Sequence, residues 1–242
     1  MDLYSCFVIN LKRRQERKKN MQAILPENFN VIFTSDFHGP FDGKTMRPSD
    51  IKNYRLYDWK IESNNKWWNR DLKKGEIGCA ISRYFCWKLA LQKDYLISIF
   101  LEDDVTLANN FQYKFNQLLY SVNNYDISWD MIYLGRSRVG KDTPINNFIV
   151  KPGYSYSSRG YVMSKKGLIK ILKARYDQNI IPVDEFLPAL YMNHPREDIR
   201  SIFKSCMQVY APIQDIVFHR KDSFSDTEES DYIGSEYNHL IN

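Results

Sequence analysis

The chain has 242 residues, of which 43% are hydrophobic and 26% are charged, and its formal net charge is +5. This length and apolar fraction are enough for a sizeable core and exclude disordered and fibrous proteins. No apolar run approaches the roughly 20 residues that cross a bilayer, and the start lacks the basic lead and apolar stretch of a signal peptide.

The first predicted unit is a strand, a helix and a second strand. Residues 4–11 (YSCFVINL) and 29–37 (FNVIFTSDF) are rich in β-branched and aromatic residues, and the basic residues 12–19 between them begin a predicted helix. This order opens an α/β sheet with parallel neighbours, in which ligands bind outside the carboxyl ends of the strands. Residues 10–17 and 34–36 fall at that edge.

The basic residues KRRQERKK at 12–19 have two interpretations. They could attract phosphate or nucleic acid, or they could be a solvated helix face with Glu16 interspersed. Because the net charge is modest, we expect no nucleic-acid partner.

Residues 39–74 are rich in turn formers and aromatic residues without a steady period, which predicts a long ordered loop with one short helix at 48–54. Trp67 and Trp68 in this loop either stack on a sugar or fill the core beneath it.

A confident helix is predicted over residues 74–94, where apolar side chains recur at i, i+3, i+4 and i+7. Gly75 and Glu76 lie at its start, where free backbone N–H groups face outward. Cys79 and Cys86, seven residues apart, are expected on one buried face of this helix. None of the four cysteines forms a CxxC pair, so neither zinc nor a redox couple is indicated.

A buried strand at 95–101 (YLISIFL) ends in three consecutive carboxylates, Glu102, Asp103 and Asp104. Acidic residues after a strand can cap a helix or lie solvated in a loop. Alternatively, they can hold a cation such as Mg²⁺ or Mn²⁺, since neighbouring carboxylates otherwise repel one another. In an extended chain Glu102 and Asp104 point to one side, and Asp103 points to the other.

The second half of the chain continues the α/β pattern. It predicts a helix at 108–122, a strand at 129–135, and a strand or turn followed by a helix at 153–176. The polar, acidic residues 222–242 are expected to form a loosely ordered tail, and residues 1–242 to be one domain.

Three of these features converge on one edge of the predicted sheet. The acidic triplet ends one strand, Arg13 and Arg17 follow another, and a helix begins at Gly75. Together they would suit a nucleotide diphosphate bound through a metal ion.

Five sequence motifs resemble glycosyltransferase family 25, and most closely its collagen-modifying branch. They are VINLKRRQERKKNM at 8–21, KGEIGCAISRYFCW at 74–87, FLEDDV at 100–105, and IPVDEFLPALYMNHP at 181–195 followed by FSDTEES at 224–230. The resemblance implies a GT-A fold, a Rossmann-like α/β/α sandwich with a mostly parallel central sheet, that uses a UDP-hexose and Mn²⁺.

The resemblance also assigns roles to particular residues. Glu102 and Asp104 would contact the metal and the diphosphate, Asp103 would face the ribose, and His219 would complete the metal shell unless it is a solvated loop histidine. The residues expected to contact the donor are Ile9, Asn10, Leu11, Arg13, Arg17, Thr34, Gly75, Glu76, Cys79, Ser82, Glu102 and Asp103. The family usually has a Ser-His pair where this chain has Ser82 and Arg83.

Asp184 and Glu185 lie between two prolines in PVDEFLP and are the predicted catalytic carboxylates. One of them would accept a hydrogen bond from the acceptor hydroxyl and, if the reaction inverts the sugar, serve as general base. The alternative is that Asp184 only caps a helix.

The expected function is transfer of galactose or glucose from a UDP-sugar to hydroxylysine or galactosyl-hydroxylysine of a collagen-like polypeptide. A lipooligosaccharide-type galactosyltransferase with a glycan acceptor is the second hypothesis, and a non-catalytic glycan-binding relative is the third. As given, the sequence suggests a cytoplasmic protein without a membrane partner, and its many Asn, Lys, Ile and Tyr residues suggest a viral or microbial gene. A homo-oligomer is left open.

Overall fold

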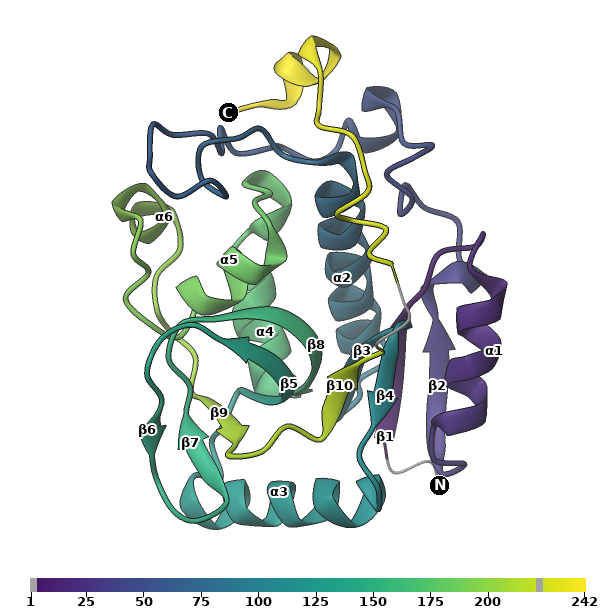
Figure 1. Cartoon of the computed structure of the whole chain (residues 1–242), viewed down its shortest axis with the longest axis vertical. Helices are drawn as coiled ribbons and strands as arrows, with labels where there is room; N and C mark the ends of the chain where they lie inside the picture. The colour runs from purple at the N-terminus through teal and green to yellow at the C-terminus, as the bar shows by residue number, and fades with distance from the viewer. Residues whose placement is uncertain (1–3, 221–223) are drawn as a thin grey trace.

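The structure is a computed structural model and describes residues 4–220 and 224–242. Its centre is a sheet of eight strands in the order β2-β1-β3-β8-β5-β9-β7-β6 (Figure 1). The strands are β1 (Tyr4–Ile9), β2 (Phe29–Phe33), β3 (Ile97–Glu102), β5 (Met131–Arg138), β6 (Thr143–Pro144), β7 (Ile149–Lys151), β8 (Ser155–Ser164) and β9 (Val209–Pro212). Strands β4 (Val105–Leu107) and β10 (Val217–His219) form a separate antiparallel pair.

Most strands of the sheet run in one direction. Strand β1 is parallel to both β2 and β3, and β5 is parallel to β9. Strand β8 is antiparallel to its neighbours β3 and β5, so those two have the same direction as each other.

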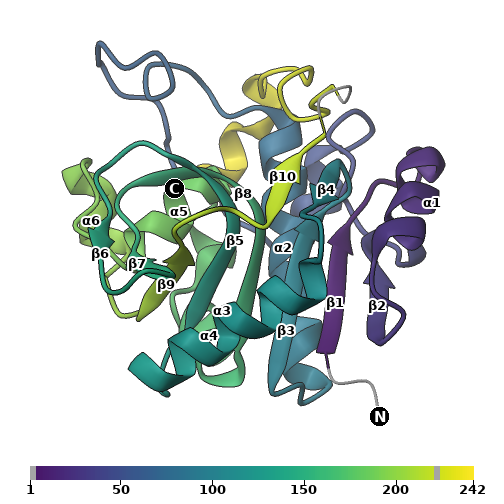
Figure 2. The ribbon, with the colours of Figure 1, turned by 60° about the horizontal axis from the view of Figure 1, so that its bottom comes forward.

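Helices cover both faces of the sheet. They are α1 (Gln15–Ile24), α2 (Lys74–Gln92), α3 (Phe111–Tyr125), α4 (Lys165–Lys173), α5 (Val183–Ala189) and α6 (Glu197–Ile202). Helices α2, α4 and α5 pack into one core with one face of the sheet, and α1 and α3 pack into a second core with the other. Figure 2 shows α3 crossing the strands on the face nearest the viewer. The predicted fold class, an α/β/α sandwich with a mostly parallel central sheet, is confirmed.

The alternation of side chains along buried strands explains the two cores. Phe7 and Phe100 lie in the α2 core, with ring centroids 5.3 Å apart, whereas the next residues, Val8 and Leu101, lie in the α3 core. A strand buried on both faces is apolar at successive positions, which is why these strands have no polar alternation in the sequence.

The long segment between β2 and α2 is irregular, as predicted, except for short 3₁₀ turns such as Pro48–Ile51. The C-terminal segment differs from the prediction of a loose tail. Tyr237 and Leu240 are fully buried, and the Tyr237 hydroxyl donates to the Met46 carbonyl at 2.9 Å. Residues 222 and 223 of the predicted tail lie outside the described residues. A few apolar side chains in a polar segment give no periodic signal, so this packing has no clear sequence signature.

None of the helices in the described part of the chain is long and apolar enough to cross a bilayer.

Candidate active site

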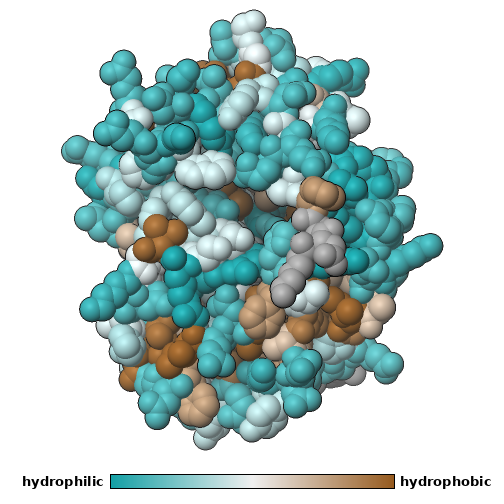
Figure 3. Space-filling view, in the orientation of Figure 1, coloured by the Kyte–Doolittle hydropathy of each residue, from teal (hydrophilic) through white to brown (hydrophobic). Residues whose placement is uncertain are grey.

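Two adjoining cavities open beside the carboxyl ends of β1 and β3. The cavity volume is about 80 Å³ for the first and about 350 Å³ for the second, and both are partly open to solvent. Figure 3 shows the molecule hollowed near the centre of this face, with mostly hydrophilic side chains around the hollow. Both cavities are lined by Cys79, Glu102, Asp104, Ser225 and Thr227. The acidic end of β3 therefore lies where the two cavities meet.

The end of β1 forms one wall of the first cavity. Ile9 and Leu11 line it, as predicted, but Asn10 and Thr34 lie behind the wall and are almost fully buried. The Thr34 hydroxyl accepts from the Asn10 backbone N–H at 2.7 Å and donates to the Asn10 carbonyl at 2.8 Å. Thr34 and Asn10 thus shape the turn after β1 without lining the cavity.

Asp103 is held from behind by two donors. The Asn10 side-chain amide donates to its Oδ2 at 2.7 Å, and Arg17 Nη1 donates to its Oδ1 at 3.0 Å. Burial raises the pKa of Asp103, and these two hydrogen bonds only partly offset that effect. Asp103 lines the first cavity only, whereas Glu102 and Asp104 line both, in agreement with the predicted alternation. The triplet does not cap a helix, because α3 begins several residues later at Phe111.

Glu102 forms an ion pair with Arg83, a fully buried arginine of helix α2 that also donates to the Ser158 carbonyl at 3.1 Å. Burial raises the pKa of Glu102 to about 7; Arg83 opposes the rise, while Asp104 and Asp184 add to it. Arg83 supplies a fixed positive charge behind the acidic cluster.

Asp104 is the member of the triplet that meets the predicted histidine. Its Oδ2 lies 3.3 Å from His219 Nε2 on β10 and 3.7 Å from Arg17 Nη1. A carboxylate is a donor that suits Mn²⁺, and an imidazole is a common ligand of transition metals. Glu102 is paired with Arg83 instead, and no group of three His, Cys, Asp or Glu side chains within residues 4–220 and 224–242 is arranged to hold a metal ion. Asp104 and His219 supply two donor atoms, and Mn²⁺ at this position remains a prediction.

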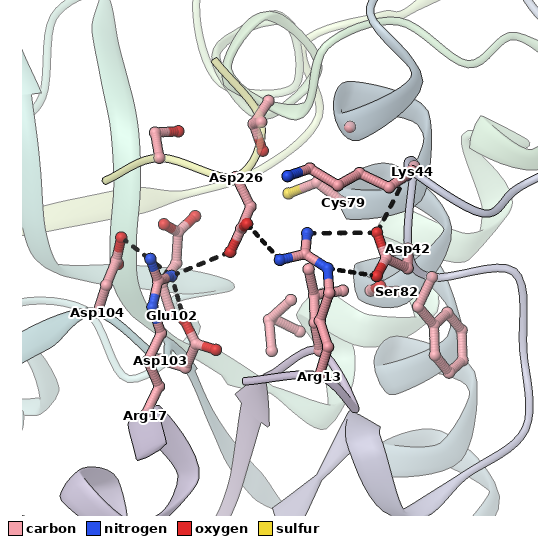
Figure 4. Close-up of a pocket in the computed structure, with 17 residues that line it drawn as sticks. Arg13, Arg17, Asp42, Lys44, Cys79, Ser82, Glu102, Asp103, Asp104 and Asp226 are labelled. Atoms are coloured by element: carbon pink, nitrogen blue, oxygen red, sulfur yellow. Dashed lines mark hydrogen bonds and ion pairs between the residues drawn. The ribbon is translucent and has the colours of Figure 1, made fainter. Parts of the chain in front are cut away.

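Asp226, from the FSDTEES motif, occupies the middle of the first cavity (Figure 4). Its carboxylate lies 2.6 Å from Arg13, 2.7 Å from Arg14 and 3.5 Å from Arg17. Burial alone would raise the pKa of Asp226, but hydrogen bonds from Arg14 and Arg13 lower it overall. Arg13 and Arg17 of the basic stretch therefore line the first cavity, whereas Lys12, Glu16 and Lys19 are exposed to solvent, so each interpretation of the stretch holds for part of it.

The amino terminus of α2 is covered by the segment that follows Asp226. Gly75 N–H donates to Ser230 Oγ at 2.9 Å, Lys74 N–H donates to the Asp231 carbonyl at 2.8 Å, and Glu76 accepts from Lys73 N–H at 2.8 Å. The expectation that this helix end offers free N–H groups to a ligand is wrong for these positions. A Cβ on Gly75 would lie 2.6 Å from Ser230 Oγ, so glycine permits the close approach. Gly75, Cys79 and Ser82 still line the first cavity, and Glu76 lines the second.

Asp184 and Glu185 both line the second cavity, but in different environments. Ser158 donates to Asp184 Oδ1 through its backbone N–H at 3.1 Å and its hydroxyl at 2.9 Å. The N-cap of α5 is Pro182, so Asp184 does not cap the helix. Its charge raises the pKa of Glu102, which places it within electrostatic reach of the acidic triplet.

Glu185 is almost fully buried and accepts four hydrogen bonds. The donors are His194 Nε2 at 2.8 Å, Tyr156 Oη at 3.0 Å, Trp68 Nε1 at 3.0 Å, and the Tyr154 hydroxyl. His194 Nδ1 accepts from the Arg196 N–H, which fixes the proton on Nε2. Burial would raise the pKa of Glu185, but the hydrogen bonds lower it overall. Glu185 thus anchors the tryptophan loop to β8, and Asp184 is the better candidate for the base.

We expect Glu185→Gln to lower the free energy of unfolding at pH 7 by about 2 kcal/mol, because an amide cannot accept all four hydrogen bonds of a buried carboxylate. The pKa of Glu185 is lower in the folded protein than its ordinary value of 4.5. The ionised side chain therefore stabilises the fold fully above pH 4.5, and this stabilisation is lost as the pH falls through the pKa of Glu185 in the folded protein. Urea unfolding should show that the difference in free energy of unfolding between wild type and Glu185→Gln becomes smaller as the pH falls from 7 to 3. Glu62→Gln, at an exposed glutamate, serves as the control. If the difference in free energy of unfolding does not depend on pH, the stabilising role of ionised Glu185 is contradicted.

Several residues of the site have weak or no sequence signals. Asp42 pairs with Arg13 at 2.6 Å from within the irregular segment, and Tyr154 and Tyr156 come from the region predicted as a strand or turn. Asp226 lies in a motif that the resemblance included without giving it a role. Trp68 packs partly against the core, in agreement with core filling, whereas Trp67 is exposed in the second cavity, where stacking on a sugar remains a prediction.

Comparison with known proteins supports the family resemblance. The model of glycosyltransferase family 25 (LPS biosynthesis protein) matches residues 4–187. The chain is 33% identical over 212 residues to procollagen galactosyltransferase 1-A of Xenopus laevis, covering 84% of this chain and 33% of that protein. It is 31% identical to human procollagen galactosyltransferase 2, covering 82% of this chain and 32% of that protein.

Not all relatives carry the name of an active enzyme. The human protein named inactive glycosyltransferase 25 family member 3 is 33% identical, covering 81% of this chain and 33% of that protein. The chain spans about a third of the length of these curated relatives. The match of the family model over most of the chain, together with the acidic end of β3, shows that the chain belongs to glycosyltransferase family 25.

Proposed function

We propose that the chain transfers galactose or glucose from a UDP-sugar to hydroxylysine or galactosyl-hydroxylysine of a collagen-like polypeptide, in a metal-dependent reaction. The observation that carries the proposal is that two cavities meet at Glu102 and Asp104. One cavity holds an arginine cluster suited to a diphosphate, and the other holds Asp184, suited to an acceptor hydroxyl. The names of the procollagen galactosyltransferases support the choice of acceptor.

The donor nucleotide would occupy the first cavity. Ile9 and Leu11 line it near the end of β1 and would contact the uracil and ribose. Arg13 and Arg17 reach the same space, and guanidinium groups pair with phosphate oxygens through two parallel hydrogen bonds. Their charge would stabilise the negative charge that develops on the leaving UDP.

Mn²⁺ would be held by Asp104 and His219, and when bound it would supply positive charge to the diphosphate. Glu102 stays in its ion pair with Arg83 and contributes negative charge beside the reacting sugar, where the transition state becomes positive. Asp184 would accept the proton of the acceptor hydroxyl if the configuration inverts. If it is retained, Asp184 would only orient the acceptor.

The test is a panel of UDP-sugars, with peptides that carry lysine, hydroxylysine or galactosyl-hydroxylysine as acceptors. We expect UDP release with UDP-galactose or UDP-glucose, dependent on Mn²⁺ and increased by a hydroxylysine-containing acceptor. A folded chain that releases UDP from no donor contradicts the proposal. Proton NMR of the product's anomeric centre identifies the stereochemical outcome.

A glycan acceptor is the second candidate, because the family model carries the description LPS biosynthesis protein. Transfer to a lipooligosaccharide core but to no hydroxylysine peptide would replace the leading proposal with this one. The inactive relatives make a non-catalytic binding protein the third, which predicts ligand binding without UDP release.

Asp226→Asn should tighten UDP binding about threefold to tenfold, as expected when one or two partly exposed ion pairs no longer compete with the ligand. The reason is that Asp226 engages Arg13, Arg14 and Arg17, so the diphosphate must displace a carboxylate. Isothermal titration calorimetry with UDP measures the change. Glu16→Gln, which alters an exposed partner of Arg14 outside the cavity, is the control. Weaker binding in Asp226→Asn would show that Asp226 positions the arginines instead.

A further inference from the structure

Trp67 presents a large aromatic surface inside the second cavity. Its exposed fraction is 47%, and it lines the second cavity but not the first. Trp59 and Arg70 beside it also line only the second cavity. An indole left open to water within a concave site is typical of a surface that a ligand covers.

Neighbouring residues hold Trp67 in place. The Arg70 guanidinium lies 5.0 Å from the Trp67 ring centroid, and Arg70 is fixed by two hydrogen bonds to Glu76, at 2.9 and 2.5 Å. The Trp59 indole N–H donates to the Trp67 carbonyl at 3.0 Å. The Arg70 contact holds the indole and the Trp59 hydrogen bond holds the backbone of Trp67 before any ligand arrives, which lowers the entropy lost on binding.

A second, independent feature of the same cavity is the backbone at Ser157. Its φ is 54°, in the left-handed region that a serine rarely adopts. The residues on either side serve the cavity too: Tyr156 donates to Glu185, and Ser158 donates to Asp184. In a regular strand consecutive side chains point to opposite faces, so the distorted backbone at Ser157 within β8 accounts for Tyr156 and Ser157 both lining the second cavity while Ser158 contacts Asp184.

We propose that Trp67 is the platform of a sugar subsite, and that the preferred acceptor therefore already carries a hexose. A hexose ring has an apolar C–H face that packs on an indole and a rim of hydroxyls that donate to carboxylates. The second cavity offers both, with Trp67 as the flat surface and Asp184 and Glu228 as acceptors. This inference rests on the proposed function and selects galactosyl-hydroxylysine from its two acceptors.

The position of Trp67 indicates that the hexose packed on it belongs to the acceptor and not to the UDP-sugar donor. Arg13 and Arg17, the arginines that face the diphosphate, line the first cavity only, whereas Trp67 lines the second only. Asp184, the candidate base, lies in the second cavity with Trp67. A sugar of the acceptor can thus contact the platform while its hydroxyl faces the base.

The kinetic test compares peptides of one sequence with hydroxylysine or galactosyl-hydroxylysine. In wild type kcat/KM should be higher with the galactosylated peptide, and Trp67→Ala should lower the ratio of the two values about tenfold, as for loss of one stacking contact. Trp67→Phe should restore most of the ratio, and Tyr120→Ala, an exposed aromatic of α3 outside both cavities, should leave it unchanged. An equal fall with both peptides, an unchanged ratio, or a raised KM for the UDP-hexose overturns the subsite.

Binding without turnover separates this inference from the proposed function. Saturation-transfer NMR with methyl β-galactoside should show ring-proton signals with wild type and Trp67→Phe but not with Trp67→Ala. If these signals appear while no UDP-sugar releases UDP, the subsite stands and the proposed function fails. If UDP is released but wild type shows no signals, the subsite fails and the proposed function stands.

Discussion

Asp104→Ala is expected to abolish turnover, with a fall in kcat of about a thousandfold or more, while the fold survives. Asp104 lies where the two cavities meet, and it faces both His219 at 3.3 Å and Arg17 at 3.7 Å. Alanine removes the carboxylate that would hold the metal beside the leaving diphosphate. UDP release measured with saturating Mn²⁺ and UDP-hexose gives the effect on kcat.

The same substitution should leave stability nearly unchanged. It removes one charge from a crowded acidic cluster, and Arg17 keeps its pairs with Asp103 and Asp226. Asp94→Asn is a matched control, because this exposed aspartate precedes β3 at the opposite edge of the sheet. Circular dichroism and thermal unfolding establish that the Asp104 variant is folded. Near-normal activity in that folded variant would refute the role of Asp104 at the metal.

Asp184→Asn is expected to lower kcat for transfer by about a hundredfold to ten-thousandfold, the usual effect of losing a general base. The amide oxygen of asparagine can still accept the two hydrogen bonds from Ser158, so the side chain should keep its position. The substitution removes the negative charge that would take the acceptor's proton. The Kd for UDP, measured by calorimetry, should change little, since Asp184 lines the second cavity and not the first.

Glu185→Gln provides the comparison for Asp184→Asn. Glu185 has all four hydrogen bonds directed at it from the protein, so its loss should show mainly as lower stability and weaker acceptor binding. If Glu185→Gln reduces kcat more than Asp184→Asn does in folded, stable protein, the two roles must be exchanged. If neither variant loses activity, the base lies elsewhere or the reaction retains configuration without one.

The residue patterns were enough to predict an α/β sheet and the position of the acidic triplet, and the family resemblance added the α/β/α sandwich. Strands such as 95–101 are continuous apolar runs, which is the local pattern of a strand buried on both faces. The helix at 74–94 has a strong apolar period, which is the local pattern of a helix packed on a sheet. Because ligands bind at the carboxyl ends of parallel strands, the sequence also placed Arg13, Arg17 and Glu102 near one another, and all three line the first cavity in the structure.

Only the tertiary structure decided which residues line the site and which support it. Thr34 and Asn10 are polar residues at the correct edge, but their hydrogen bonds with each other and with Asp103 put them behind the wall. Asp184 and Glu185 are neighbours in the sequence, yet one faces Ser158 and the other is enclosed by four donors. A sequence shows that a carboxylate is present but not how many donors surround it.

The segment from Asp226 to Ser230 shows most clearly that the sequence does not reveal the partners of a side chain. Asp226 and Ser230 are more than 200 and 150 residues from Arg13 and Gly75 in the chain, yet each pair is in direct contact. Such contacts depend on how an irregular polar segment packs across the end of helix α2, and no local period encodes that path. The sequence therefore determined the scaffold and the chemistry available at its edge, because these follow from local patterns of apolar and charged residues. The tertiary structure decided the partners of each charge, because long-range packing sets them.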